Sequence, residues 1–160
     1  MWQGEPLLDR ELGSREDAMS LLRWKDEYLT QVEEIDNQHR RLFDLINGIY
    51  DLIRVGRGSA NIVEALGEVL EFTQFHFATE EKFMDATSFP AAEGHKGEHE
   101  RLLDQIRELR RSIRDGRTVM SMNEMYFLKD WLLSHFQGPD RGLASHLLIR
   151  AVPLIEDAAI

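Results

Sequence analysis

The sequence predicts an all-α fold: an up-down-up-down antiparallel four-helix bundle with an N-terminal extension and a short C-terminal helix. Apolar residues recur at steps of three and four along the chain, and no segment shows the alternation that is typical of β-strands. Three turn segments, 56–59, 87–90 and 115–117, separate four such stretches. Because these connections are short, successive helices are expected to be antiparallel neighbours.

The first two predicted helices span about Asp36 to Arg54 and about Ser59 to Ala86. Both begin with residue types that commonly cap helix N-termini. Each carries an apolar stripe at helical spacing, which indicates one buried face. The stripes consist of Leu42, Phe43, Ile46, Ile49 and Ile53 in the first helix, and Ile62, Leu66, Val69, Phe72, Phe83 and Met84 in the second.

The third and fourth predicted helices span about Ala92 to Arg114 and about Val119 to Gln137, with stripes of the same spacing. Gly138-Pro139 is then expected to interrupt the helix, because proline ends a regular α-helix. A short last helix is expected from Asp140 to Ile149.

We divide the chain into three parts. Residues 1–35 are expected to form an extension packed on the bundle, residues 36–150 the bundle itself, and residues 151–160 an apolar tail. A short helix is expected in the extension from about Ser14 to Trp24. The length of 160 residues fits one domain with a sizeable core.

The composition excludes several classes of function. A net charge of −10 argues against a nucleic-acid partner, which requires a positive surface, and less strongly against an anionic membrane surface. The chain has no cysteine, which excludes disulfides, thiolate metal sites and cysteine nucleophiles. It shows no signal peptide and no apolar window that could span a bilayer, so the expected location is cytoplasmic.

Histidines and carboxylates continue the apolar stripes at one level of the bundle. In an antiparallel hairpin, residues equidistant from the turn lie at the same level. His39 and His76 are equidistant from the first turn, and His76 and His99 from the second. His99 and His135 are equidistant from the third turn, and the Gly138-Pro139 break allows a following carboxylate to reach the same level. The candidate metal ligands are His39, His76, Glu80, His95, His99, His135 and Asp140.

The number of these residues favours a two-metal site. A lone histidine on an apolar face is usually a packed core residue, but several unpaired polar groups at one level would each cost a few kcal/mol. Imidazole together with carboxylate suits iron, zinc, manganese or copper. If Glu80 and Asp140 bridge two octahedral ions, with one solvent oxygen, a single coordination position stays open. His146 lies beyond this level and is interpreted as a surface or packing residue.

Apolar residues near the same level would form a dry pocket around the open position. The predicted pocket residues are Phe43, Phe72, Trp131 and Leu132, with Phe77 and Phe136 as further wall residues. Such a pocket would hold a diatomic gas and exclude ionic substrates. Ordinary core packing is the alternative for each aromatic ring.

The motifs around these candidates resemble those of the hemerythrins, most closely the bacterial hemerythrin-like single domains. The resemblance rests on Trp24, on the segments 35–39 (IDNQH), 76–84 (HFATEEKFM), 89–90 (FP) and 131–135 (WLLSH), and on His95, His99 and Asp140. It covers roughly Trp24 to Leu148. Two positions depart from the family pattern: Gln31 stands where a glycine is common, and Gly138-Pro139 where a less constrained pair is usual.

The resemblance implies a non-haem di-iron centre, with two oxo- or hydroxo-bridged iron ions, that binds O2 reversibly. By matched motif, one iron would be held by His95, His99 and His135, and the iron with the open position by His39 and His76. Glu80 and Asp140 would be the bridging carboxylates.

The sequence is compatible with three functions. The leading hypothesis is an O2-binding protein, for storage, delivery or sensing, that is not an enzyme. The second is a di-iron redox enzyme: a peroxidase, an oxidase or a nitric-oxide-handling protein. The third is a gas or redox sensor module that acts through a partner protein, which the sequence does not identify. The histidine-rich ligand set favours the first, because ferritin-like di-iron enzymes use more carboxylates.

Overall fold

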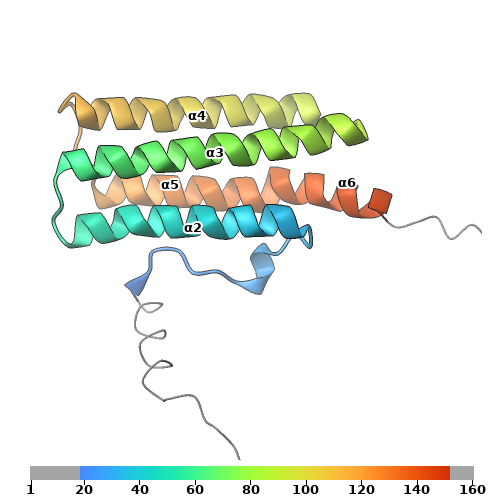
Figure 1. Cartoon of the computed structure of the whole chain (residues 1–160), viewed down its shortest axis with the longest axis horizontal. Coiled ribbons are helices and arrows are strands. Elements are labelled where there is room, and N and C mark those ends of the chain that lie inside the picture. The colour runs from blue at the N-terminus through green and yellow to red at the C-terminus, as the bar shows by residue number, and fades with distance from the viewer. Residues whose placement is uncertain (1–18, 152–160) are drawn as a thin grey trace, which may run out of the picture.

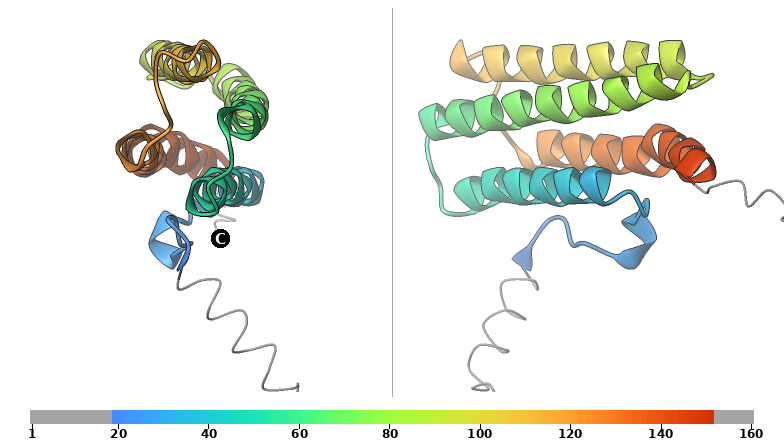
Figure 2. Two further views of the ribbon diagram at one scale, coloured as in Figure 1. Left: turned by 90° about the vertical axis from the view of Figure 1, so that its left-hand side faces the viewer. Right: turned by 45° about the vertical axis from the view of Figure 1, so that its right-hand side comes forward.

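The structure, a computed structural model, describes residues 19–151. Helices α2 (Glu33–Arg54), α3 (Ser59–Thr87), α4 (Ala92–Arg114) and α5 (Met122–His135) run back and forth along one axis (Figure 1). Viewed end-on, they occupy the four corners of a bundle (Figure 2). The predicted all-α four-helix bundle is therefore confirmed. Within the described residues, no helix combines the length and apolarity needed to cross a membrane.

The apolar stripes meet in a core at the end of the bundle near the 56–59 and 115–117 turns. Each fully buried aliphatic side chain stabilises the fold by about 1.5–3 kcal/mol relative to exposure. The aliphatic part of this core includes Leu42, Ile46, Ile49, Ile62, Leu66, Val69, Ile106, Ile113, Met125 and Leu128. This packing fixes the helices relative to one another, and so positions the side chains at the other end.

The start of α2 differs from the prediction, because Asp36 is not its N-cap. The helix begins at Glu33. The Asp36 carboxylate instead accepts hydrogen bonds from the backbone N–H and the hydroxyl of Thr30, both at 2.8 Å, and from the N–H of Gln31 at 3.2 Å. These bonds hold a turn in which Gln31 has φ +68°, a left-handed conformation that glycine adopts more readily.

The start of α5 also differs, and here a better cap explains the shift. The helix begins at Met122 rather than at Val119. Ser121 precedes it and accepts a hydrogen bond from the N–H of Asn123, while Glu124 accepts one from the N–H of Ser121. This reciprocal capping box satisfies backbone donors that would otherwise be unpaired.

The ends of α3 are close to the predicted ones. Ser59 is the first helical residue, but Gly58 is the N-cap and no side chain caps the helix. The helix ends at Thr87 rather than at Ala86, and Ser88 follows in the left-handed conformation with φ +52°. Such a left-handed residue is a common helix terminator.

The predicted helix from Ser14 to Trp24 lies partly outside the described residues, and residues 20–24 are not helical. Asn47 of α2 accounts for this, because its side chain accepts a hydrogen bond from the N–H of Leu22 at 2.9 Å and donates to the Leu22 carbonyl at 2.8 Å. Residues 19–32 lie along α2 (Figure 1), with a 3-10 turn, η1, at Asp26–Tyr28. The predicted apolar tail, apart from Ala151, lies outside the described residues.

Candidate metal centre

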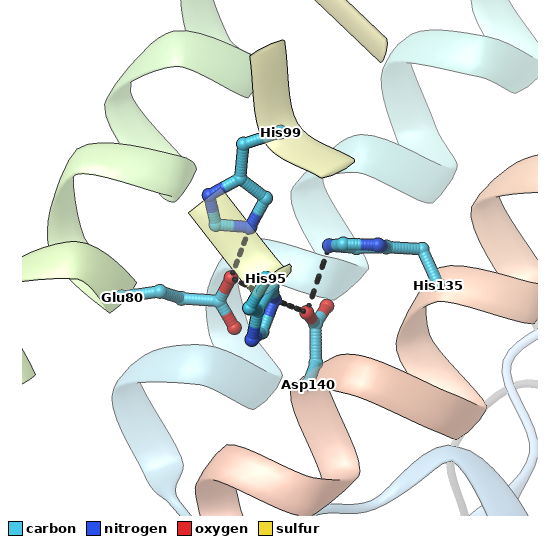
Figure 3. A group of neighbouring side chains, drawn as sticks. All are labelled: Glu80, His95, His99, His135 and Asp140. Carbon is cyan, nitrogen blue, oxygen red and sulfur yellow. Dashed lines mark hydrogen bonds and ion pairs between the residues drawn. The ribbon is translucent and has the colours of Figure 1, made fainter. Parts of the chain in front are cut away.

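The side chains that the sequence suggests as metal ligands lie together inside the bundle. They come from α2 (His39), α3 (His76, Glu80), α4 (His95, His99), α5 (His135) and the π-helical turn η2, Phe136–Asp140 (Asp140). All are buried, with relative exposures between 0% and 4%. Figure 3 shows five of them pointing toward one another. His146 lies apart, with its Nε2 at 3.2 Å from the carbonyl oxygen of Thr87.

The donor atoms form two overlapping groups. In the three-histidine group (Glu80, His95, His99, His135 and Asp140), one donor atom from each residue lies within 4.8 Å of all the others. The two-histidine group (His39, His76, Glu80 and Asp140) meets the same distance limit. Each histidine belongs to one group, whereas both carboxylates belong to both. This arrangement allows two metal ions that share the carboxylates.

Asp140 lies between the two groups and presents one oxygen to each. Its Oδ1 is 3.0 Å from Nε2 of His95 and 2.9 Å from Nε2 of His135. Its Oδ2 is 3.0 Å from Nε2 of His39 and 3.7 Å from Nε2 of His76. A carboxylate that faces two sets of imidazoles through different oxygens has the orientation of a bridging ligand.

A π-helical turn, and not a break in the chain, brings Asp140 to this position. The predicted interruption at Gly138-Pro139 is wrong, because η2 joins α5 directly to α6 (Arg141–Ala151). In an α-helix, a residue five positions after His135 would point away from it. The i to i+5 hydrogen bonding of a π-turn returns that residue to the same face. The π-turn therefore aligns Asp140 with His135.

Glu80 is the other shared carboxylate, and the histidine nitrogens near it all lie on the side of one oxygen. Its Oε2 lies 3.2 Å from Nε2 of His99 and 3.7 Å from Nε2 of both His76 and His95. Neither oxygen of Glu80 has a hydrogen-bond partner in the described part of the chain. Both oxygens are therefore available to a cation.

Three residues that the sequence analysis did not single out contact the outer nitrogens of the histidines. Nδ1 of His76 lies 2.8 Å from Oε1 of Gln38, and Nδ1 of His99 lies 3.0 Å from Oε1 of Glu81. Nδ1 of His135 lies 3.4 Å from Oε1 of Glu98. Such partners orient ligating imidazoles. Equidistance from the turns could have indicated all three. Gln38 and His76 are equidistant from Arg57, Glu81 and His99 from Pro90, and Glu98 and His135 from the 115–117 turn.

Comparison with known proteins agrees with this geometry. The sequence profile of the hemerythrin HHE cation binding domain matches residues 30–147. The chain belongs to the hemerythrin family. It is 30% identical over 139 residues to a bacteriohemerythrin of Pseudomonas aeruginosa, covering 87% of this chain and 90% of the relative. It is also 30% identical over 129 residues to one of Stenotrophomonas maltophilia, covering 81% and 83%.

A solved structure shares the fold as well. The structure described as wild-type hemerythrin aligns with this chain at a TM-score of 0.75 and 26% sequence identity. The alignment covers 80% of this chain and 98% of the other.

The chemistry of the site fits metal ions. Within the described residues of this hemerythrin domain, several buried polar atoms have no hydrogen-bond partner, including both oxygens of Glu80 and Nε2 of His76, His99 and His135. Nε2 of His135 is close to Asp140 but out of line for a hydrogen bond. Leaving such a group unpaired costs about 1–3 kcal/mol. A cation bonded to these atoms would remove that cost, and imidazole with carboxylate suits iron.

Two histidines of the hemerythrin domain, His76 and His99, are held in the neutral form that binds metal. Burial lowers the pKa of His76 to about 4. Burial, together with the nearby His95 and His135, lowers the pKa of His99 to about 2. At neutral pH these two rings are therefore uncharged, and neutral imidazole is the ligating form.

The two shared carboxylates have opposite pKa shifts. Burial, and next the charge of Asp140, raise the pKa of Glu80 well above its ordinary value. Burial also disfavours the charged form of Asp140, but the facing His135, His39 and His76 outweigh it and hold its pKa well below the ordinary value. A cation between the two carboxylates would favour the charged form of both.

The predicted pocket residues take different positions around the hemerythrin site. The ring of Trp131 stacks on His135 at a centroid distance of 5.8 Å, and Leu132 is buried in the core. Phe43 stacks on Phe136 at 6.1 Å. Phe72 instead packs against Phe75 at 5.6 Å and lines a surface cavity between α2 and α3.

The rings in closest contact with the candidate ligands are the two that the sequence offered as further wall residues. Phe136 stacks on His39 with a centroid distance of 3.4 Å. Phe77 stacks on His99 at 3.7 Å. Each donor group therefore has one imidazole covered by a phenyl ring.

Proposed function

We propose that this hemerythrin domain binds O2 reversibly at a di-iron centre held by the seven buried residues. The observation that supports the proposal is the pair of donor groups that share Glu80 and Asp140. The three-histidine group would hold one iron ion and the two-histidine group the other. When bound, the two ferrous ions would supply the electrons and the coordination position that reversible O2 binding requires.

The side chains of the protein would confine the gas and protect the site. Phe136, stacked on His39, and Phe77, stacked on His99, keep bulk water away from the imidazoles. An apolar surrounding holds a neutral diatomic molecule and disfavours anions. Each histidine and carboxylate of the two groups is itself a candidate ligand, so none of them is spare to act as a general base. This inventory favours binding over hydrolysis.

The proposal is tested by anaerobic loading of the purified protein with ferrous ion, followed by metal analysis and addition of O2. The expected result is close to two iron ions per chain. On addition of O2, a visible absorption band should appear and should disappear when the gas is removed. A resonance Raman band in the O–O stretching region should shift when the heavy isotope of oxygen replaces the common one.

Two outcomes would contradict the proposal. Retention of no more than one ion per chain would exclude the shared-carboxylate arrangement. Rapid, irreversible oxidation with turnover of hydrogen peroxide or nitric oxide would instead support a redox enzyme.

A further inference from the structure

The proposed ligands are nearly closed off from solvent, yet metal ions must reach them. His95 is the most exposed of the seven, at 4%, and a cavity of about 260 Å³ opens against it. The cavity is bordered by the start of α4 and by η2 and α6. This cavity brings an open space up to a proposed ligand.

Three glycines account for the open space. Gly94 on α4, Gly138 on η2 and Gly142 on α6 all line the cavity. A Cβ atom added at any of the three would meet no atom within 4 Å. A larger side chain at these positions would therefore fill the cavity without a backbone clash.

The polar groups of the cavity suit a cation. Glu98 lines it, with a side chain that is 33% exposed, and Oε1 of Glu98 lies 3.4 Å from Nδ1 of His135. Glu98 thus connects solvent with the three-histidine group. Apart from Glu98 and His95, the lining residues are glycines or apolar residues such as Phe89 and Pro139. On a protein with a net charge of −10, such a cavity attracts cations and repels anions.

The size of the cavity also fits a hydrated ion. Six waters, at about 30 Å³ of liquid volume each, occupy roughly 180 Å³. The cavity of about 260 Å³ exceeds this volume, as the entry of a hexahydrated divalent cation would require.

Position distinguishes an ion from the gas as the occupant. His95 belongs to the three-histidine group. The open coordination position that the resemblance to the hemerythrins implies for O2 would belong to the two-histidine group. His39 and His76 do not line this cavity. The cavity therefore opens toward the three-histidine group, where an incoming metal ion would bind, and not toward the coordination position proposed for O2.

We propose that this cavity is the portal through which ferrous ions enter and leave the centre, with Glu98 as the first contact and His95 as the first ligand. The inference rests on the metal centre of the proposed function. A portal acts on rates and not on equilibrium, so blocking it should slow metal uptake and removal by the same factor.

The test compares Gly94→Leu with Gly97→Leu. Both glycines lie on α4 and both have open space for a side chain, but only Gly94 lines the cavity. Anaerobic stopped-flow mixing of the metal-free protein with ferrous ion, and extraction of the loaded protein by a chelator, give the two rates. Gly94→Leu should be at least tenfold slower in both directions with unchanged final occupancy. Gly142→Leu, which fills the same cavity from α6, serves as a second blocking variant.

A second pair of variants separates the charge of Glu98 from its contact with His135. Glu98→Gln and Glu81→Gln each remove a carboxylate that contacts a histidine of the three-histidine group. Only Glu98→Gln should slow uptake severalfold and weaken the dependence of the uptake rate on ionic strength. Equal rates in the two variants would remove Glu98 from the proposal.

The outcomes distinguish the portal from the centre itself. If the wild type loads two ions and Gly94→Leu loads them as fast as Gly97→Leu, the portal is wrong and the centre stands. If the wild type retains no metal, both proposals are wrong. If O2 binding to the loaded protein is slowed by Gly94→Leu while iron uptake is not, the cavity serves the gas and the assignment to metal is overturned.

Discussion

Oε1 of Gln38 on α2 accepts a hydrogen bond at 2.8 Å from Nδ1 of His76 on α3. The amide nitrogen of Gln38 donates to the hydroxyl of Thr79 at 3.2 Å, which sets the orientation of the amide. Because an amide oxygen only accepts, Nδ1 of His76 carries the proton and Nε2 is bare toward the carboxylates. His99 and His135 face Glu81 and Glu98 instead. The two donor groups therefore differ in the charge of the residues behind their histidines.

Replacing Gln38 by leucine should weaken metal binding at the two-histidine group. Loss of a residue that orients a ligand typically costs about 10–100-fold in metal affinity. Chelator competition with ferrous ion, performed without air, measures the two affinities. Gln38→Glu keeps an acceptor for Nδ1 and should recover most of the loss, whereas Asn37→Leu at an exposed neighbouring position should have no effect. Unchanged affinity in Gln38→Leu would mean that the hydrogen bond does not position His76.

His39→Ala and Asp140→Ala should have different effects on metal content. His39 belongs to one donor group, so its loss should leave about one ion per chain, in the three-histidine group. Asp140 belongs to both groups, so its loss should lower the occupancy of both ions. Metal analysis with far-UV circular dichroism as a check of folding makes the comparison. Equal losses in the two variants would argue against the division into groups.

Gln31→Gly should stabilise the fold. Gln31 has φ +68°, and a left-handed conformation costs a residue other than glycine about 1–2 kcal/mol. Glycine loses about 0.5–1 kcal/mol through its greater freedom in the unfolded chain. The net gain should be about 0.5–1 kcal/mol in the free energy of unfolding. Chemical denaturation measures it, and Gln31→Ala, which keeps the strain, should show no gain.

The capping box of α5 should make stability depend on pH. The hydrogen bond from Ser121 lowers the pKa of Glu124. Because the folded-state pKa is the lower one, the stabilisation is present above the ordinary carboxyl pKa and is lost as the pH falls through the lowered value. At neutral pH, Glu124→Gln should cost about 1 kcal/mol or less of unfolding free energy. The difference from wild type should shrink in acid.

Thermal unfolding at neutral and acidic pH measures this effect. Asp130→Asn, at an exposed carboxylate later in α5, is the matched control and should behave like the wild type at both pH values. A deficit of Glu124→Gln that is the same in acid would show that the carboxylate charge does not matter to the cap.

The helices were predictable because their signals are local. Apolar spacing of three and four, with short turns, predicts α4 from Ala92 to Arg114, and the structure has the same bounds. The N-terminus of α2 was not predictable in this way. Asp36 has the chemistry of a cap, but its carboxylate is bound by Thr30 and Gln31, which local propensity does not reveal.

The sequence by itself determined the level of the candidate ligands, because helix rise is uniform and the turns define the hairpins. Their donor atoms lie within 4.8 Å of one another in two groups, although metal binding itself stays a prediction. Only the tertiary structure decided that Asp140 reaches His135 through a π-turn and divides its oxygens between the groups. It also decided that Phe136 covers His39 while Phe72 packs on Phe75. These features depend on how side chains from separate helices pack, and helical periodicity carries no information about that packing.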